Sequence, residues 1–373
     1  MIISLKEYKD EVIYFSLFDI LIKKVAPNRD IYLEDMDISP TTYKRCKNRL
    51  SKKGREIIQK LATHFGYKVA TDEFIDELEE RINRIYHNVY YKIESKYQED
   101  IEYLDKLIEE NYLINPILKL MKLFIIFNYL DDIKRLYVEN EELYNEVKDN
   151  KSFYSSDLLE LYEIFNILLL NDIDIYLLAR KYKNELCYSA LASKLFKNGK
   201  YIECLYLSQK IKLQYLQDEN FKRLYSINLN IIACCNILGE YKQAYDLSHK
   251  EMLSLESLDI TDSYYSNSEF HYLIACLGLG KYKEIVNILD YREKYNMKQL
   301  LILSIAKYKI GIDEYLEIYK VFALSKFLKD ADDFMIIVND IIYNKRIDKI
   351  ELLSDPKYRI PTVLHNILKK MFS

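Results

Sequence analysis

Tryptophan is absent from this 373-residue chain, and glycine, proline and long apolar runs are scarce. Only 7 glycines occur, where average usage predicts about 26. No apolar run reaches the roughly 18 residues needed to cross a bilayer, and the N-terminus lacks the basic and then apolar layout of a signal peptide. We therefore expect a cytoplasmic protein with no membrane partner.

The patterns that carry most enzyme chemistry are also missing. There is no glycine-rich phosphate loop of the GxGxxG or GxxxxGK[ST] type. The 5 histidines show no metal-ligand spacing. The 6 cysteines form no CxxC pair, so we expect reduced thiols inside a helical core. The sequence thus predicts no catalytic residues, no metal site and no cofactor.

The few glycines are regularly placed. Gly199, Gly239 and Gly280 are 40 and 41 residues apart, and each stands between an apolar segment and a charged residue followed by tyrosine. Glycine ends a helix well because it adopts the left-handed backbone without steric cost. Self-similarity at this period is typical of stacked helical hairpins. Gly311 predicts another turn of the same kind.

The segments around these turns resemble tetratricopeptide repeats. The small residue expected three positions after the tyrosine is Ala244 in one repeat, but the others depart from the pattern with Cys204 and Ile285. Fainter copies flank them, and no proline occurs from 117 to 355. The predicted fold class is all-α, with a right-handed α-solenoid of hairpins over about residues 115–325.

The charge is unevenly distributed along the chain. Residues 1–70 contain 14 Lys/Arg against 9 Asp/Glu, a net charge of +5, whereas the remaining 303 residues carry −9. A basic head on an acidic body favours contact between the head and a polyanion.

The head has a helix-turn-helix pattern. We predict helices over residues 5–26, 30–36, 41–50 and 56–67, the third opened by Ser39 as N-cap and Pro40 at the first helical position. The layout resembles the DNA-binding domains of bacterial repressors, from which it departs at Leu33 (usually small) and Asp37 (usually glycine).

On that pattern Tyr43 and Cys46 face inward. The outward positions assigned to DNA are Ser39, Thr41, Thr42, Lys44, Arg45, Asn48, Lys52 and Lys53. The alternative is a basic, solvated surface on an ordinary helical cap of the solenoid.

Two further segments complete the domain plan. A heptad-like seam predicted over residues 72–112 is either a coiled-coil dimer contact or the core face of a linker helix; it comprises Ile75, Leu78, Ile82, Ile85 and Val89. A last helix over 362–371 should cap the final repeat. The expected domains are residues 1–70 (DNA-binding), 71–114 (linker), 115–325 (solenoid) and 326–373 (cap).

A helix-turn-helix joined to such a solenoid resembles the RRNPP-type regulators of Gram-positive bacteria and their phages. The resemblance implies a homodimeric transcription regulator that binds a double-stranded DNA operator and is switched by a short linear signalling peptide in the solenoid groove. The repeat register assigns to the peptide Asn128, Tyr162, Ser226, Asn230, Asn236, Asn267 and His271. The alternative is a solenoid adaptor that inhibits a response regulator or phosphatase and never touches DNA.

Overall fold

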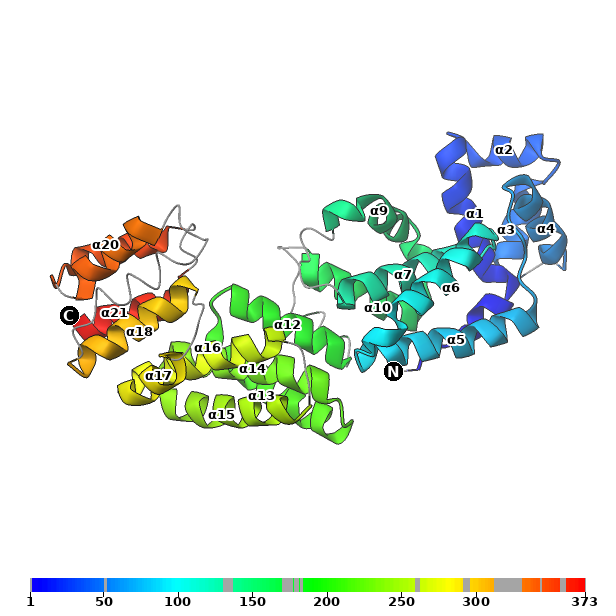
Figure 1. Ribbon diagram of the computed structural model, residues 1–373. Coiled ribbons are helices and arrows are strands. Elements are labelled where there is room, and N and C mark those ends of the chain that lie inside the picture. The colour runs from blue at the N-terminus through cyan, green and yellow to red at the C-terminus, as the bar shows by residue number, and fades with distance from the viewer. Residues whose placement is uncertain are drawn as a thin grey trace. The chain divides into compact units, whose positions relative to one another are not determined.

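The computed structural model describes residues 2–49, 52–129, 137–169, 177, 181, 184–258, 262–290, 296–311, 331–342, 344–355 and 360–372. Over these ranges the chain is helical (Figure 1), and the only β-type pairing is one isolated bridge between Lys68 and Tyr112. The predicted all-α class is therefore confirmed. Among these same residues no helix is both long enough and apolar enough to span a bilayer.

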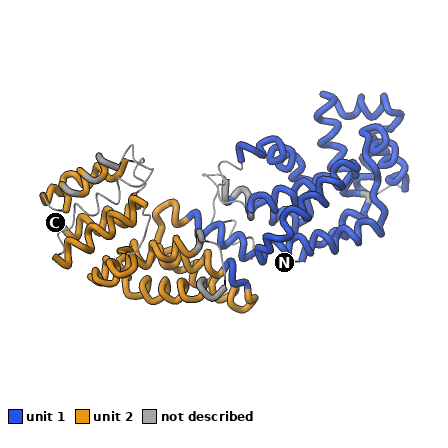
Figure 2. The backbone as a smooth tube through the Cα atoms, viewed as in Figure 1, with its two compact units in different colours: residues 1–194, 220–223 blue, residues 195–219, 224–373 orange. Residues whose placement is uncertain are grey.

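The chain divides into two compact units (Figure 2). Unit 1 comprises residues 1–194 with 220–223, and unit 2 comprises residues 195–219 with 224–373. The basic head thus shares one unit with the helices that follow it, and the unit boundary falls near residue 194.

The head contains η1 (Lys6–Lys9), α1 (Glu11–Val25), α2 (Arg29–Asp35), α3 (Pro40–Lys47) and α4 (Gly54–His64). The single helix expected over residues 5–26 is interrupted at Asp10. The Asp10 carboxylate accepts a hydrogen bond from the Val12 N–H at 3.0 Å and so caps a new helix. Around α1 the apolar residues Phe15, Phe18 and Ile22 are fully buried.

The N-terminal residues tie the head to the rest of unit 1. The buried Tyr8 hydroxyl donates to the Phe153 carbonyl at 2.9 Å and accepts from the Ser155 N–H at 2.8 Å. The Ile3 N–H donates to Asn83 Oδ1 at 2.8 Å. Removing residues 1–70 would therefore expose core surface, so the head is an integral part of unit 1.

The remaining described helices of unit 1 follow the head along the chain. They are α5 (Asp72–Tyr90), η2 (Glu94–Lys96), α6 (Tyr97–Glu109), α7 (Asn115–Tyr129), α9 (Glu141–Asp149), η3 (Lys151–Phe153) and α10 (Ser156–Leu169), followed by α12 (Glu185–Lys197) at the unit boundary. Every residue of the heptad-like seam on α5 is at most 2% exposed. The seam is therefore the core face of a helix, and the coiled-coil interpretation is wrong.

Unit 2 contains the glycine-punctuated hairpins. Its helices are α13 (Tyr201–Gln217), α14 (Phe221–Leu238), α15 (Tyr241–Leu258), α16 (Asp262–Gly278), α17 (Tyr282–Leu289), α18 (Met297–Lys309), α20 (Ala331–Ile342), η4 (Ile347–Ser354) and α21 (Thr362–Phe372). The predicted last helix is thus confirmed as α21, whose Leu364 and Leu368 join a core with residues of α16, α18 and α20.

The glycine turns are built as predicted. Gly199, Gly239, Gly280 and Gly311 have φ values of +75°, +87°, +72° and +77°. After Gly239 the Glu240 N–H donates to the Cys235 carbonyl at 2.8 Å, and Gly199 and Gly280 are followed by the same bond. This six-to-one bond defines a Schellman helix end, which needs a left-handed residue.

Buried positions also repeat from hairpin to hairpin. Cys204, Ala244 and Ile285 occupy one register position on α13, α15 and α17, and all three are fully buried. Ser208, Ser248 and Leu289, one turn further along, are fully buried as well. The second helix of each hairpin therefore turns the same face inward, which fixes which of its residues face solvent.

Candidate nucleic-acid interface

The turn between α2 and α3 is a Schellman helix end without glycine. The Ile38 N–H donates to the Leu33 carbonyl and the Asp37 N–H to the Glu34 carbonyl, both at 2.8 Å. Leu33 and Ile38 are buried, and Asp37 takes the left-handed conformation with a φ of +52°. Aspartate thus occupies the left-handed position at which the helix-turn-helix pattern of bacterial repressors usually has glycine.

The start of α3 agrees with its sequence signal. Ser39 is extended, with φ −61° and ψ 125°, and Pro40 is the first helical residue. The Ser39 side chain makes no capping hydrogen bond to α3. Ser39 therefore acts as N-cap through its backbone, while its side chain lies on the exposed surface.

The inward face of α3 carries the two residues that the helix-turn-helix pattern predicts. Tyr43 is 1% exposed and Cys46 is 3% exposed. The Tyr43 hydroxyl shares its one proton between the Phe15 carbonyl and Asp19 Oδ1, each at 3.1 Å. Its ring meets the Phe15 ring edge-on, with 5.0 Å between the ring centroids. Burial, reinforced by Asp19, raises the pKa of Tyr43 far above its ordinary value. The hydroxyl therefore stays protonated and holds α3 against α1.

Asp19 is a structural anchor of the helix-turn-helix that is not among the residues predicted from the sequence. Its carboxylate also pairs with Lys47 of α3 and, at 3.5 Å, with Arg29 of α2. The Arg29 guanidinium lies 5.7 Å from the Tyr43 ring centroid. One carboxylate on α1 thus contacts both helices of the helix-turn-helix. The available signal was an acidic residue within an otherwise apolar stretch of α1.

The outward face of the head carries the residues assigned to DNA. Thr42 is half-buried, and the others are exposed: Ser39, Thr41, Lys44, Arg45, Asn48, Lys52 and Lys53. Three neighbouring cations are paired with carboxylates: Lys47 with Asp19, Arg49 with Asp10 and Lys60 with Asp37. These pairs reduce the positive charge beside α3 without covering its outer face.

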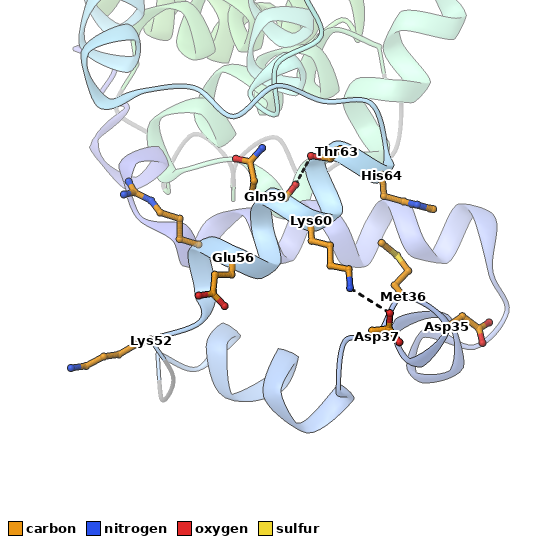
Figure 3. A pocket seen from close by; sticks show the side chains of 10 residues that line it. Asp35, Met36, Asp37, Lys52, Glu56, Gln59, Lys60, Thr63 and His64 are labelled. Atoms are coloured by element: carbon orange, nitrogen blue, oxygen red, sulfur yellow. Dashed lines mark hydrogen bonds and ion pairs between the residues drawn. The ribbon is translucent and has the colours of Figure 1, made fainter.

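A hollow lies between α4 and the α2–α3 turn (Figure 3). Lys60 reaches from α4 to Asp37, with 3.9 Å between Nζ and Oδ2, while Lys52 points away from the other lining side chains. Three carboxylates, of Asp35, Asp37 and Glu56, line the hollow beside Lys52, Arg55 and Lys60, so the lining offers phosphate no net positive charge. The surface suited to a polyanion is therefore the outer face of α3 and the segment leading into α4.

The residues predicted to bind a peptide are divided between the two units. Asn128 and Tyr162 belong to unit 1, and the other five to unit 2. Asn128 accepts a hydrogen bond from Arg223 at 3.3 Å and donates to the Phe124 carbonyl at 2.8 Å. Tyr162 is 3% exposed, and the Lys151 ammonium lies 5.2 Å from its ring centroid. Both side chains therefore take part in the packing of unit 1.

In unit 2 the assigned residues lie on α14 and α16. Asn267 is exposed, and Ser226, Asn230 and His271 are half-buried. Ser226 and Asn230 occupy the same repeat positions as Asn267 and His271, which are 41 residues further on. A ligand on the first helices of the hairpins could reach Asn267 and the exposed parts of Ser226, Asn230 and His271, although Nδ1 of His271 is buried.

Asn236 joins α14 to α16. It is 1% exposed, and its Nδ2 donates to the His271 carbonyl at 2.9 Å. Asn236 Oδ1 and His271 Nδ1 are buried and have no hydrogen-bond partner among the residues that the structure describes. Burial, with a smaller effect of Lys298, lowers the pKa of His271 to about 4, so the ring is neutral at pH 7. Asn236 is thus a packing residue with an unsatisfied acceptor, beside a neutral histidine.

No group of His, Cys, Asp and Glu in the described part of the chain is arranged to hold a metal ion. Comparison of the chain with protein-family models, with curated proteins and with solved structures yields no match.

Proposed function

We propose that this protein is a DNA-binding transcription regulator whose helical repeats bind a short linear peptide. The observation that carries the proposal is the geometry of α3. Its inward residues Tyr43 and Cys46 are buried and Tyr43 is hydrogen-bonded to Asp19, while Lys44, Arg45 and Asn48 are exposed along one face. A helix anchored in this way can present its outer side chains to a major groove.

The test of DNA binding uses the full-length chain and random-sequence duplex DNA, followed by fluorescence anisotropy at several salt concentrations. If Lys44 and Arg45 contact phosphates, Lys44→Ala and Arg45→Ala should each weaken binding and lower the salt slope by about one. Lys148→Ala, an exposed lysine on α9, is the matched control. An affinity that is the same in all four proteins would remove α3 as the recognition helix.

The peptide half of the proposal rests on unit 2. Ser226, Asn230, Asn267 and His271 offer polar side chains at equivalent positions of successive hairpins, and polar side chains can hydrogen-bond an extended backbone. The net negative charge beyond residue 70 favours a neutral or basic ligand and disfavours DNA there.

The peptide test is calorimetry of the full-length chain against a synthetic library of short linear peptides. Asn230→Ala and His271→Ala should weaken peptide binding and leave peptide-free DNA binding unchanged. Asn236→Ala is unsuitable as a probe, because it removes a buried hydrogen bond and would lower stability as well. If no peptide of the library binds while DNA binding stays intact, the peptide-sensing role is contradicted and the DNA-binding role is not.

A protein-binding adaptor is the second candidate. It is favoured by the carboxylates that accompany the basic face, because Asp10, Asp19 and Asp37 each pair with a cation near α3. A surface of mixed charge suits a protein partner better than a duplex. Duplex binding that is absent at low salt would favour this candidate.

A further inference from the structure

The outer face of α13 is unusually apolar for a solvent-facing helix. Ile202, Tyr206, Leu213 and Leu216 are 71%, 72%, 63% and 44% exposed. With Gln209, which is also exposed, they follow one another at spacings of four, three, four and three residues. This is the spacing of a helix seam that packs against a second helix.

The repeat register shows that this face is specific to α13. The positions of Ile202 and Tyr206 are occupied on α15 by Lys242 and Asp246, and on α17 by Lys283 and Asn287, which are exposed polar residues. The position of Leu213 is apolar on α15 as well, since Leu253 is 56% exposed.

The same positions therefore face outward in each hairpin. At two of these positions α13 carries large apolar side chains, whereas α15 and α17 carry charged or polar ones. A run of such residues on one helix is typical of an interaction surface.

We infer that this face binds the same face of a second copy of the chain, with the two α13 helices antiparallel. In that register Ile202 lies opposite the second copy's Leu213, and Tyr206 lies opposite its Gln209. A twofold axis repeats each contact, so one helix supplies both sides of the interface.

The flanking charges select this partner and this direction. Glu203 and Lys210 are both exposed and border the seam. In the antiparallel register Glu203 of each copy faces Lys210 of the other, which gives two symmetric pairs of opposite charge. In a parallel register Leu205 would take the place of Glu203 beside Lys210, and no such pair would form.

The expected dimer is weak. A helix of 17 residues is about 25 Å long, and one such helix pair buries less area than a standard stable interface. We therefore expect dissociation in the micromolar range. The inference uses unit 2 alone and does not depend on the binding of DNA or peptide.

Sedimentation equilibrium of the full-length chain over a range of micromolar concentrations tests this inference. Glu203→Lys or Lys210→Glu turns two attractive pairs into two repulsive ones, so each should raise the dimer Kd about tenfold. The double variant Glu203→Lys/Lys210→Glu should restore the wild-type Kd. Tyr206→Asp, which places a charge in the seam, should leave a monomer.

Lys250→Glu is the matched control, because Lys250 occupies the position of Lys210 on α15 and is also exposed. Circular dichroism melts establish that each variant is folded; Tyr206→Asp repeats the test at a different position of the same face. A wild-type chain that stays monomeric, or a Kd that the single charge reversals leave unchanged, overturns the inference. Failure of the double variant to recover overturns the antiparallel register.

Discussion

The head and the repeats close their helices with the same turn and different residues. The α2–α3 turn and the turns after α12, α14 and α16 share the six-to-one backbone hydrogen bond. The left-handed position is Asp37 in the head and glycine in the repeats. Non-glycine residues pay about 1–2 kcal/mol for this conformation, least for aspartate and asparagine. The repeats therefore use the least strained residue, whereas the head keeps a side chain there.

The two regions also differ in what holds neighbouring helices together. In the head, Tyr43, Lys47 and Arg29 converge on the carboxylate of Asp19. In the repeats, small residues allow close approach: the Tyr241 ring lies directly over Gly278 of α16. The contact of α3 with α1 thus depends on polar partners, and the contact of Tyr241 with Gly278 depends on shape.

The largest loss of stability is expected where the helices pack most tightly. A Cβ atom added at Gly278 would lie 2.3 Å from Cγ of Tyr241, at the root of the ring, where the side chain cannot move away by a small rotation. Gly278→Ala should therefore lower the free energy of unfolding by about 3 kcal/mol, although alanine favours a helix.

Chemical denaturation of the full-length chain measures this loss. In the background Tyr241→Ala, the added methyl group meets no ring, so Gly278→Ala should cause little further loss. Additive losses in the double variant would mean that the contact between Tyr241 and Gly278 is not the cause.

Two carboxylates, the half-buried Asp19 and the buried Glu251, extend the comparison to pH. Asp19 has several partners, whereas Glu251 of α15, 6% exposed, has one hydrogen bond in the described structure, from Asn228 Nδ2 at 2.6 Å. Burial raises the pKa of Glu251 to about 7, against the lowering effects of Asn228, Lys212 and Lys250. Because the folded state then binds the proton more tightly than the unfolded state, stability is full below the ordinary pKa of about 4.5 and falls as the pH rises through 7.

The second prediction follows from this fall in stability with rising pH. Glu251→Gln keeps the hydrogen-bond acceptor and removes the buried charge, so it should raise the free energy of unfolding at pH 8 by about 2–3 kcal/mol and change it little at pH 5. Urea denaturation at both pH values measures the difference. An equal effect at pH 5 and pH 8 would show that ionisation of Glu251 is not responsible.

The third prediction concerns the repeat turns themselves. Apart from the two chain neighbours, no described residue has an atom within 4 Å of a Cβ placed at Gly239, so its φ of +87° is the feature that resists substitution. Gly239→Val should lower the free energy of unfolding by about 1–2 kcal/mol, and Gly239→Asn should lower it less, because asparagine tolerates this conformation. Thermal melts that rank valine and asparagine equally would contradict the backbone explanation.

These cases show what sequence alone can predict. The glycine spacing located the turns at Gly199, Gly239 and Gly280, and the Ser-Pro signal located the start of α3, because both are local backbone preferences. The seam on α5 was ambiguous, since a core face and a coiled-coil face share one periodicity. Asp19 and the burial of Asn236 depend on partners that are distant in sequence, at Tyr43 and His271, and no local pattern reports such partners.

The smallest expected effect returns to the head turn. Asp37→Gly relieves the left-handed strain of the folded state but increases the freedom of the unfolded chain, and the exposed contact with Lys60 at 3.9 Å contributes little. We expect the free energy of unfolding to rise by no more than about 1 kcal/mol. Asp37→Asn, which removes the charge and keeps the backbone preference, should leave stability unchanged. Both variants remove a carboxylate near the basic face of α3, so both should bind random-sequence duplex DNA more tightly at low salt. Urea denaturation and fluorescence anisotropy separate the two effects. A loss of stability above about 1 kcal/mol in both variants would mean that the Asp37 carboxylate, rather than its backbone, holds the turn.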